Sequence, residues 1–155
     1  MPEMTAPEQI EPKSLGDYLE VMSKAVFQSG MSWRVVNAKW PTIREAMRDF
    51  DIHAIATLSE ADLEDLAHDA RVIRNRRKLA AIVSSAQRMI DLDEEHGSFT
   101  DYLRSHNGFD ETVADLKKQF KFLGETGCYM FLYSVGEEVP PHDEWSEARQ
   151  AKTRR

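Results

Sequence analysis

A clear run of helical periodicity follows Asn75 in this 155-residue sequence. Apolar side chains recur there every three or four residues, at Leu79, Ile82, Val83, Ala86, Met89 and Ile90. This spacing places them on one face of a helix, and asparagine is a favoured N-cap residue. The pattern therefore predicts an amphipathic helix that begins after Asn75 and whose apolar face is covered by other segments of the chain.

Shorter segments with the same period lie on both sides of this helix. We expect a helix from Ser14 to about Ser29, followed by a short helix capped by Ser32. Trp40-Pro41 should end that short helix, because proline favours the first turn of a new one. Further caps or short helices are predicted at Asp51, Ser59, residues 98–105 and Val113 to Phe120.

The apolar run from Tyr129 to Val135 fits either a buried strand or a buried helix. We predict a helix, because no partner strand is visible elsewhere in the sequence. The chain is then all-α, with a loose lead over residues 1–13 and one domain of many short helices over residues 14–145. Pro140-Pro141 should be extended, and residues 146–155 should form a polar tail.

Basic side chains gather just ahead of the long helix. From Ala70 to Arg88 there are six basic residues and no acidic one. Arg76, Arg77 and Lys78 fill the first predicted turn, where the positive end of the helix dipole disfavours cations and backbone N–H groups can bind phosphate. Because charged runs usually form solvated surface, a phosphate site and an ordinary basic face both remain open on this evidence.

The composition limits the possible partners and the cellular compartment of the protein. The formal net charge of -7 argues against bulk affinity for nucleic acid, although it leaves room for a local basic patch. The single cysteine, Cys128, cannot form an intramolecular disulfide, which suits a reducing compartment. No apolar run approaches the roughly 18 residues that span a bilayer, and the N-terminus does not resemble a signal peptide. We expect a cytoplasmic protein without membrane contact.

Three stretches resemble the 3-methyladenine DNA glycosylase I family. They are Gly30-Met-Ser-Trp33 with Ala38-Lys39, the segment 69–82, and Phe120-Lys-Phe-Leu-Gly124 with Cys128-Tyr129, in the order of the family. The resemblance runs from about Leu15 to Val135. It implies the all-α helix-hairpin-helix DNA glycosylase fold and binding to double-stranded DNA. It also implies base excision repair, in which an alkylated purine is flipped and its N-glycosidic bond is hydrolysed, and we expect no cofactor.

The resemblance also gives roles to individual residues. Trp33 lies where the family stacks an aromatic ring on the flipped base, and Met31 lies at the apolar wedge position that fills the vacated stack. From the residues alone, a buried core tryptophan is the commoner outcome, and Met31 would simply cover nearby core. The hairpin at Asp69–Ile73 is expected to grip DNA phosphates, together with Arg71, Arg74, Arg76, Arg77 and Lys78. The family has glycine at the positions of Arg71 and Arg77.

Two sites of the family are missing from this sequence. The base-recognising carboxylate lies eight positions before the tryptophan, where this chain has Ala25. Glu20 is more than a helical turn away from that position, so it should not replace the carboxylate. The structural zinc site of the family uses Cys and His from both ends of the chain. Here neither residue occurs before His53, and Cys128 is the only thiol, so we predict no metal.

Tyr18 and His142 are further candidates for the base pocket. The place of Tyr18 in an apolar helical stripe favours a core role. His142 and Trp145 have two open interpretations. They either pack the C-terminal segment against the domain, or they rim the pocket while Asp143 or Glu144 replaces the missing acid.

Three functions fit the sequence, in descending order. The first is a divergent glycosylase, which stays possible without the carboxylate because a cationic base is a good leaving group. The second is a DNA-binding or lesion-sensing protein without chemistry. The third is a helical protein-interaction module, which the net charge of -7 and the missing sites favour. The sequence leaves catalytic activity open.

Overall fold

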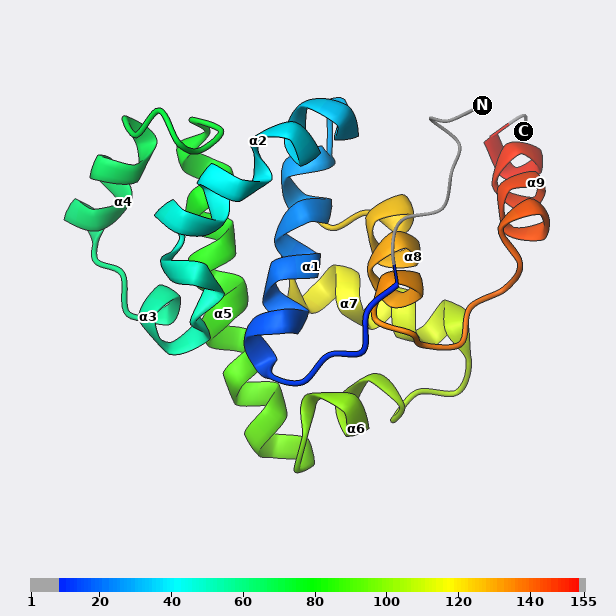
Figure 1. Cartoon of the computed structure of the whole chain (residues 1–155). Coiled ribbons are helices and arrows are strands. Elements are labelled where there is room, and N and C mark those ends of the chain that lie inside the picture. Colours follow the sequence, from blue (N-terminus) through cyan, green and yellow to red (C-terminus); the bar gives the residue numbers. More distant parts are fainter. Residues whose placement is uncertain (1–8, 154–155) are drawn as a thin grey trace.

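A computed structural model describes residues 9–153 of the chain (Figure 1). The regular secondary structure of this part is all helical, with no strand, as the sequence predicts. The helices are α1 (Leu15–Gln28), α2 (Trp33–Ala46), the 3-10 turn η2 (Arg48–Phe50), α3 (Ile52–Ala56), α4 (Glu60–Ala67), α5 (Arg76–His96), α6 (Phe99–Leu103), α7 (Phe109–Gln119), α8 (Glu125–Ser134) and α9 (His142–Thr153). Within residues 9–153 no helix is both long and apolar enough to cross a bilayer.

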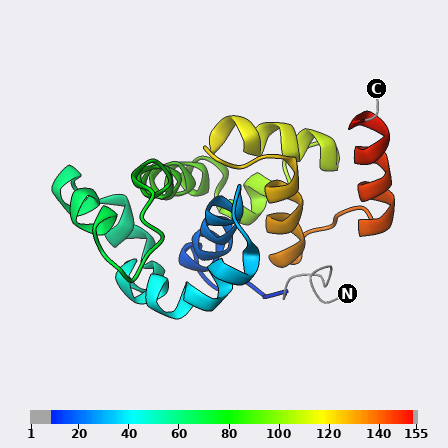
Figure 2. The same ribbon diagram turned by 90° about the horizontal axis from the view of Figure 1, so that it is seen from above.

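The two central helices are α1 and α5, which pack against each other (Figures 1 and 2). Helix α5, with 21 residues, also contacts α3, α4 and α6, and α8 packs against α1. The predicted apolar face of α5 is buried, with Leu79, Ile82 and Met89 fully enclosed. As its periodicity predicts, α5 is an amphipathic helix whose apolar face is covered by other segments of the chain.

Local capping signals fix most of the helix starts. Ser14 accepts the N–H of Asp17, and Asn75 accepts the N–H of Lys78. Ser59 and Asp62 exchange hydrogen bonds in a complete capping box. The predicted helix for the apolar run after Tyr129 is confirmed, because that run lies within α8.

The predicted break at Trp40-Pro41 is wrong, because α2 continues through Pro41 to Ala46. Proline removes one helical hydrogen bond, but packing on both sides of it holds the helix together. The Trp40 ring stacks on Phe50 at 5.5 Å between centroids, and its Nε1–H donates to Glu20 at 2.8 Å. Burial of Trp40 and Ile43 thus outweighs the local signal.

The two ends of the chain also differ from expectation. Residues 146–153, predicted as a polar tail, belong to helix α9. The signal was present, because Pro141 precedes Asp143 and Glu144, and proline and acidic residues favour a helix start. In the predicted loose lead, the N–H of Ile10 donates to the carbonyl of Ser134 at 2.8 Å, so this part is bonded to the end of α8. Residues 1–8 of the lead and residues 154–155 of the tail lie outside the described residues.

A left-handed turn joins α2 to α3. Arg48, Asp49 and Phe50 have φ values of 59°, 53° and 57°, a conformation that costs non-glycine residues about 1–2 kcal/mol each. Burial of Phe50 against Trp40 offsets this cost. Gly16 makes room for the turn, because a Cβ at that position would collide with the carbonyl oxygen of Phe50.

Replacing Gly16 with alanine is therefore expected to lower the free energy of unfolding by about 1–3 kcal/mol, as overpacking of a filled site does. Urea denaturation followed by circular dichroism measures this change. Gly124→Ala is the matched control, because no atom lies within 4 Å of a Cβ there and the φ of Gly124 is -90°. A loss from Gly16→Ala no larger than that from Gly124→Ala would contradict the steric argument.

Candidate nucleic-acid interface

The α4–α5 hairpin, residues 68–75, connects two helices that pack against each other. The side chain of Asn75 caps α5 by accepting the N–H of Lys78 at 3.1 Å. Within the described residues, the N–H groups of Arg76 and Arg77 have no hydrogen-bond partner. They project from the first turn of a 21-residue helix, where the partial positive charge of the helix favours an anion.

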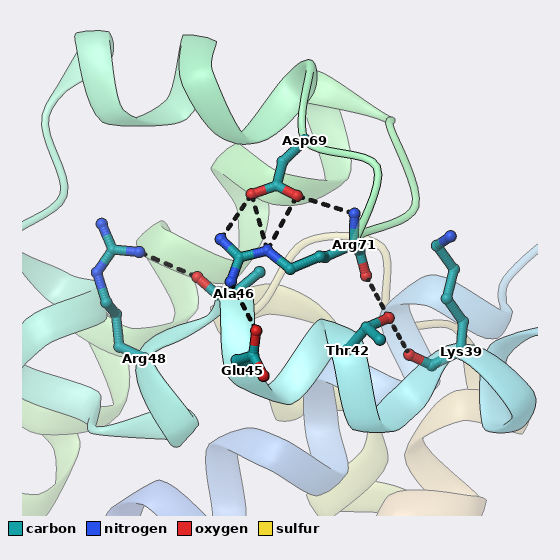
Figure 3. Close-up of polar contacts among 7 residues, drawn as sticks. All are labelled: Lys39, Thr42, Glu45, Ala46, Arg48, Asp69 and Arg71. Carbon is teal, nitrogen blue, oxygen red and sulfur yellow. Dashed lines mark hydrogen bonds and ion pairs between the residues drawn. The ribbon is translucent and has the colours of Figure 1, made fainter.

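The Arg71 side chain reaches toward α2, where it meets Glu45 (Figure 3). Its guanidinium donates to Asp69 through Nη2 at 2.8 Å and through Nε at 3.1 Å, and to Glu45 through Nη1 at 2.9 Å. The backbone N–H of Arg71 donates to the same Asp69 carboxylate at 2.8 Å. These hydrogen bonds lower the pKa of Asp69 and raise that of Arg71. One cation thus faces two carboxylates.

The positive charge of Arg76, the first residue of α5, is compensated in a similar way by carboxylates of α4. Its guanidinium lies 2.6 Å from Glu60 and 3.4 Å from Glu64. The hydrogen bond to Glu60 is the main cause that raises the pKa of Arg76. Both carboxylates are largely exposed, so the contact can rearrange, but in this structure the charge of Arg76 is neutralised.

The structure contradicts a phosphate contact for Lys78, because its side chain points into the protein and is 6% exposed. Its ammonium donates to the carbonyls of Phe27, at 3.3 Å, and Ser29 at the end of α1. A cation at a helix C-terminus satisfies carbonyls that have no helical partner. Desolvation by burial lowers the pKa of Lys78. Lys78 therefore joins the start of α5 to the end of α1.

Of the predicted phosphate-binding side chains, Arg74 and Arg77 are the two that are exposed and lack a hydrogen bond or ion pair to the described residues. They flank Asn75, beside the free N–H groups of Arg76 and Arg77. Of the basic surface that the sequence predicts for phosphate, only two arginine side chains and the N–H groups at the start of α5 therefore remain free in the described part of the chain. The assignment of these residues to phosphate stays a prediction.

Trp33 is the first residue of α2 and is 40% exposed. It follows a turn in which Gly30 has a φ of 80°, and Ser32 caps the helix by accepting the N–H of Arg34 at 3.2 Å. Met31, in the same turn, is 37% exposed. The buried-core alternative for Trp33 is therefore wrong, whereas the exposure of Met31 fits both a wedge and a loop side chain that covers nearby core. Large apolar side chains that gather on a surface are typical of a binding site.

Three other large apolar side chains are exposed among the described residues, Ile10, Val35 and Phe122, and the sequence analysis assigned none of them to a site. Val35 lies on α2 and faces solvent. Phe122, between α7 and α8, is exposed and has a φ of 60°, a strained value for an aromatic residue. The next residue, Leu123, packs close to Gly127. The motif Phe120-Lys-Phe-Leu-Gly124 contained Phe122, but its spacing gave no sign that the ring is exposed.

Ala25 lies in the interior of the junction between α1 and α8. It is buried, and a Cβ placed on Gly127 would lie 3.7 Å from the Cβ of Ala25. Glu20 cannot substitute for a carboxylate here, because it accepts the Trp40 indole N–H and pairs with Arg44 at 3.3 Å. The structure therefore gives Glu20 a packing role.

Tyr18 belongs to the core. It is buried, its hydroxyl bonds with that of Thr100 at 2.7 Å, and its ring meets the edge of Phe99. The rise of 1.5 Å per residue puts Tyr18 about 15 Å along α1 from Gln28, which is the end nearest Trp33. The structure does not bring Tyr18 to Trp33, and its proposed place in the base pocket is wrong.

His142 and Trp145 pack on α8, as the first of their two interpretations predicts. The Trp145 ring stacks on Tyr129 at 4.2 Å between centroids, and the ring of His142 lies 5.8 Å from Tyr129. The Tyr129 hydroxyl donates to the carbonyl of Pro140 at 2.6 Å. This aromatic cluster fastens the start of α9 to α8. A role for His142 at the base pocket stays a prediction.

The residues present do not fit the zinc site of the resembled family. Among the described residues, no three His, Cys, Asp or Glu side chains are placed to hold a metal ion together. Cys128 is buried in the core, where desolvation raises its pKa to about 12. A thiol that resists ionisation is a poor metal ligand, because the thiolate is the binding form.

Comparison with known proteins identifies the family. The family model for methyladenine glycosylase matches residues 16–119. The DNA-3-methyladenine glycosylase of Haemophilus influenzae is 32% identical, with 70% of each chain covered, and DNA-3-methyladenine glycosylase 1 of Escherichia coli is 30% identical with the same coverage. A crystal structure of 3-methyladenine DNA glycosylase I superimposes with a TM-score of 0.70 at 28% identity, covering 82% of this chain and 81% of that one. The chain therefore belongs to the methyladenine glycosylase family.

Proposed function

We propose that this protein binds duplex DNA through the α4–α5 hairpin, receives an extruded alkylated purine against Trp33, and hydrolyses its N-glycosidic bond. The names of the relatives support the substrate, since they are 3-methyladenine DNA glycosylases. The observation that carries the proposal is the exposure of the Trp33 indole at the first residue of α2. An indole face held at a helix start offers a flat surface on which a base can stack.

The electrostatics of the substrate suit an indole. A purine alkylated at a ring nitrogen carries positive charge, and the face of a tryptophan ring attracts a cation by about 0.5–2 kcal/mol, depending on solvent exclusion. An unmodified purine lacks this charge and stacks without that additional attraction. Trp33 therefore provides a physical basis for preferring the damaged base.

The reaction needs little acid catalysis. When water attacks the sugar carbon C1′, the bond from C1′ to the base nitrogen breaks and its electron pair stays with the base. The departing base becomes neutral, and the proton of the attacking water passes to solvent. Because the positive charge already makes the base a good leaving group, Ala25 in place of a carboxylate slows the reaction without removing its driving force.

The experiment measures release of free 3-methyladenine from methylated duplex DNA at stoichiometric protein. We expect slow release by the wild-type protein and none above background by Trp33→Ala, because that variant lacks the aromatic surface against which the base is held. Val35→Ala, which removes an exposed apolar side chain without a ring from the same helix, is the matched control. If the wild-type protein releases no base above background, the catalytic part of the proposal is wrong.

One observation favours a second function, lesion binding without chemistry. Ala25 is buried, and Glu20, the acid of α1 that the sequence analysis already excluded as a substitute, is engaged by Trp40 and Arg44. A protein of this kind would bind a lesion-containing duplex more tightly than an intact one and would release no base. The same assay combined with a binding titration separates the two functions.

A further inference from the structure

Arg71 is held by groups from two different elements (Figure 3). Asp69 belongs to the α4–α5 hairpin, whereas Glu45 lies in the last turn of α2. The guanidinium bonds to both, with Nη2 at 2.8 Å from Asp69 and Nη1 at 2.9 Å from Glu45. One positive charge with two negative neighbours leaves a local charge of -1, which repels a DNA phosphate.

The backbone of Arg71 makes a second connection to α2. Its carbonyl oxygen lies 2.9 Å from the hydroxyl of Thr42, which also lies 3.0 Å from the carbonyl of Lys39 (Figure 3). Thr42 and Glu45 are three residues apart, so they lie on the same face of α2. The side chain and the main chain of Arg71 therefore hold the hairpin against one face of this helix.

Helix α2 is the element that begins at Trp33. We propose that Arg71 is a positioning residue: through Glu45 and Thr42 it fixes the phosphate-gripping hairpin relative to the helix that presents Trp33 to the extruded base. The inference rests on the proposed function, because it concerns how two contacts with one DNA molecule keep their spacing. Two contacts with one DNA molecule reinforce each other only when their spacing fits it, so the link matters for telling damaged from intact DNA.

This role differs measurably from phosphate binding. A phosphate ligand strengthens binding to every duplex equally, and its loss lowers the slope of log K against log salt by about 0.9. A positioning residue affects the ratio of affinities for a lesion-containing and an intact duplex, and it leaves the salt slope unchanged. The ratio also cancels long-range charge effects, because the two duplexes carry the same charge.

The experiment titrates wild-type protein, Arg71→Gln, Glu45→Gln and the double variant with a duplex that carries one 3-deaza-3-methyladenine, an uncharged and non-excisable analogue of the damaged base, and with the intact duplex, at several salt concentrations. Each single variant should lower the affinity ratio about two- to five-fold, the range that exposed ion pairs supply. The double variant should lower it no further, because both changes break the same link. The salt slope should stay within about 0.3 of the wild-type value, well below the change for one lost phosphate contact.

Arg71→Lys sharpens the test. Lysine binds phosphate as a point charge but lacks the planar fork that bridges two carboxylates. We expect Arg71→Lys to lower the affinity ratio as Arg71→Gln does, whereas a phosphate ligand would be replaced by lysine with little loss. Thermal unfolding of each variant checks that the fold is retained.

The outcomes separate this inference from the proposed function. A wild-type protein that binds neither duplex overturns the proposed function and, with it, this inference. If the wild-type protein discriminates and Arg71→Gln keeps the ratio but lowers the salt slope by about 0.9, Arg71 is a phosphate ligand and this inference alone is wrong. Variants that keep both the ratio and the slope overturn it as well.

Discussion

Trp33→Ala is expected to abolish the preference of this protein for DNA that carries an alkylated purine. Stacking of a base on an aromatic side chain contributes about 1–3 kcal/mol, and the positive charge of the damaged base adds to it. The affinity for the lesion-containing duplex should fall about 5- to 150-fold, which is the same free energy expressed as a ratio. Affinity for the intact duplex should change little. Fluorescence anisotropy with labelled duplexes measures both.

Val35→Ala is the matched control for this substitution. Val35 lies two residues further along α2, and its side chain is also exposed and apolar. Because valine has no aromatic face, its loss should leave the lesion preference unchanged. Equal losses of preference in Trp33→Ala and Val35→Ala would show that general apolar contact, rather than stacking, explains the affinity. Trp33→Phe should retain part of the preference, since it keeps a ring.

The second large effect is expected from Arg74→Gln combined with Arg77→Gln. These arginines are exposed and have no ion pair with the described residues, and they lie beside the free N–H groups at the start of α5. Removing two phosphate contacts should lower the salt slope by about 1.8 and weaken binding to lesion-containing and intact duplexes alike. Charged hydrogen bonds contribute about 1.5 kcal/mol or more, so roughly tenfold is expected for each arginine.

Arg76→Gln is the control for the arginine pair. Its guanidinium is already bonded to Glu60 and Glu64, so replacing it removes little free positive charge from the surface. The salt slope of Arg76→Gln should equal that of the wild-type protein. If Arg76→Gln lowers the slope as much as Arg74→Gln does, Arg76 exchanges its carboxylate partners for phosphate, and the cationic surface is wider than the structure indicates.

The helices that the sequence predicted correctly are specified by residues that lie close together in the sequence. Ser14, Ser59 and Asn75 cap helices through contacts with residues three positions away, so their signals are local. The apolar period of α5 is local as well. Pro41 was misjudged because the packing that keeps it within a helix comes from Phe50 and Glu20, and the single sequence does not show that these side chains meet Trp40.

The candidate site was predicted less completely, because the partners of its side chains are distant in sequence. Lys78 bonds to Ser29, which is 49 residues away, and Arg71 bonds to Glu45, which is 26 residues away. Basic residues in one stretch were predicted as one phosphate surface, whereas the structure directs them to α1, α2, α4 and solvent. The position of Trp33 came from family resemblance, and its exposure came from the structure alone.

The proposed base contact can be measured without catalysis. The chain has three tryptophans, Trp33, Trp40 and Trp145, so the indole N–H region of a ¹H–¹⁵N spectrum contains three signals that single Trp→Phe variants can assign. Trp40 is buried and Trp145 stacks on Tyr129. When free 3-methyladenine is added, we predict a concentration-dependent shift of the Trp33 signal, while the other two stay in place. A shift of the Trp145 signal with Trp33 unchanged would contradict the account.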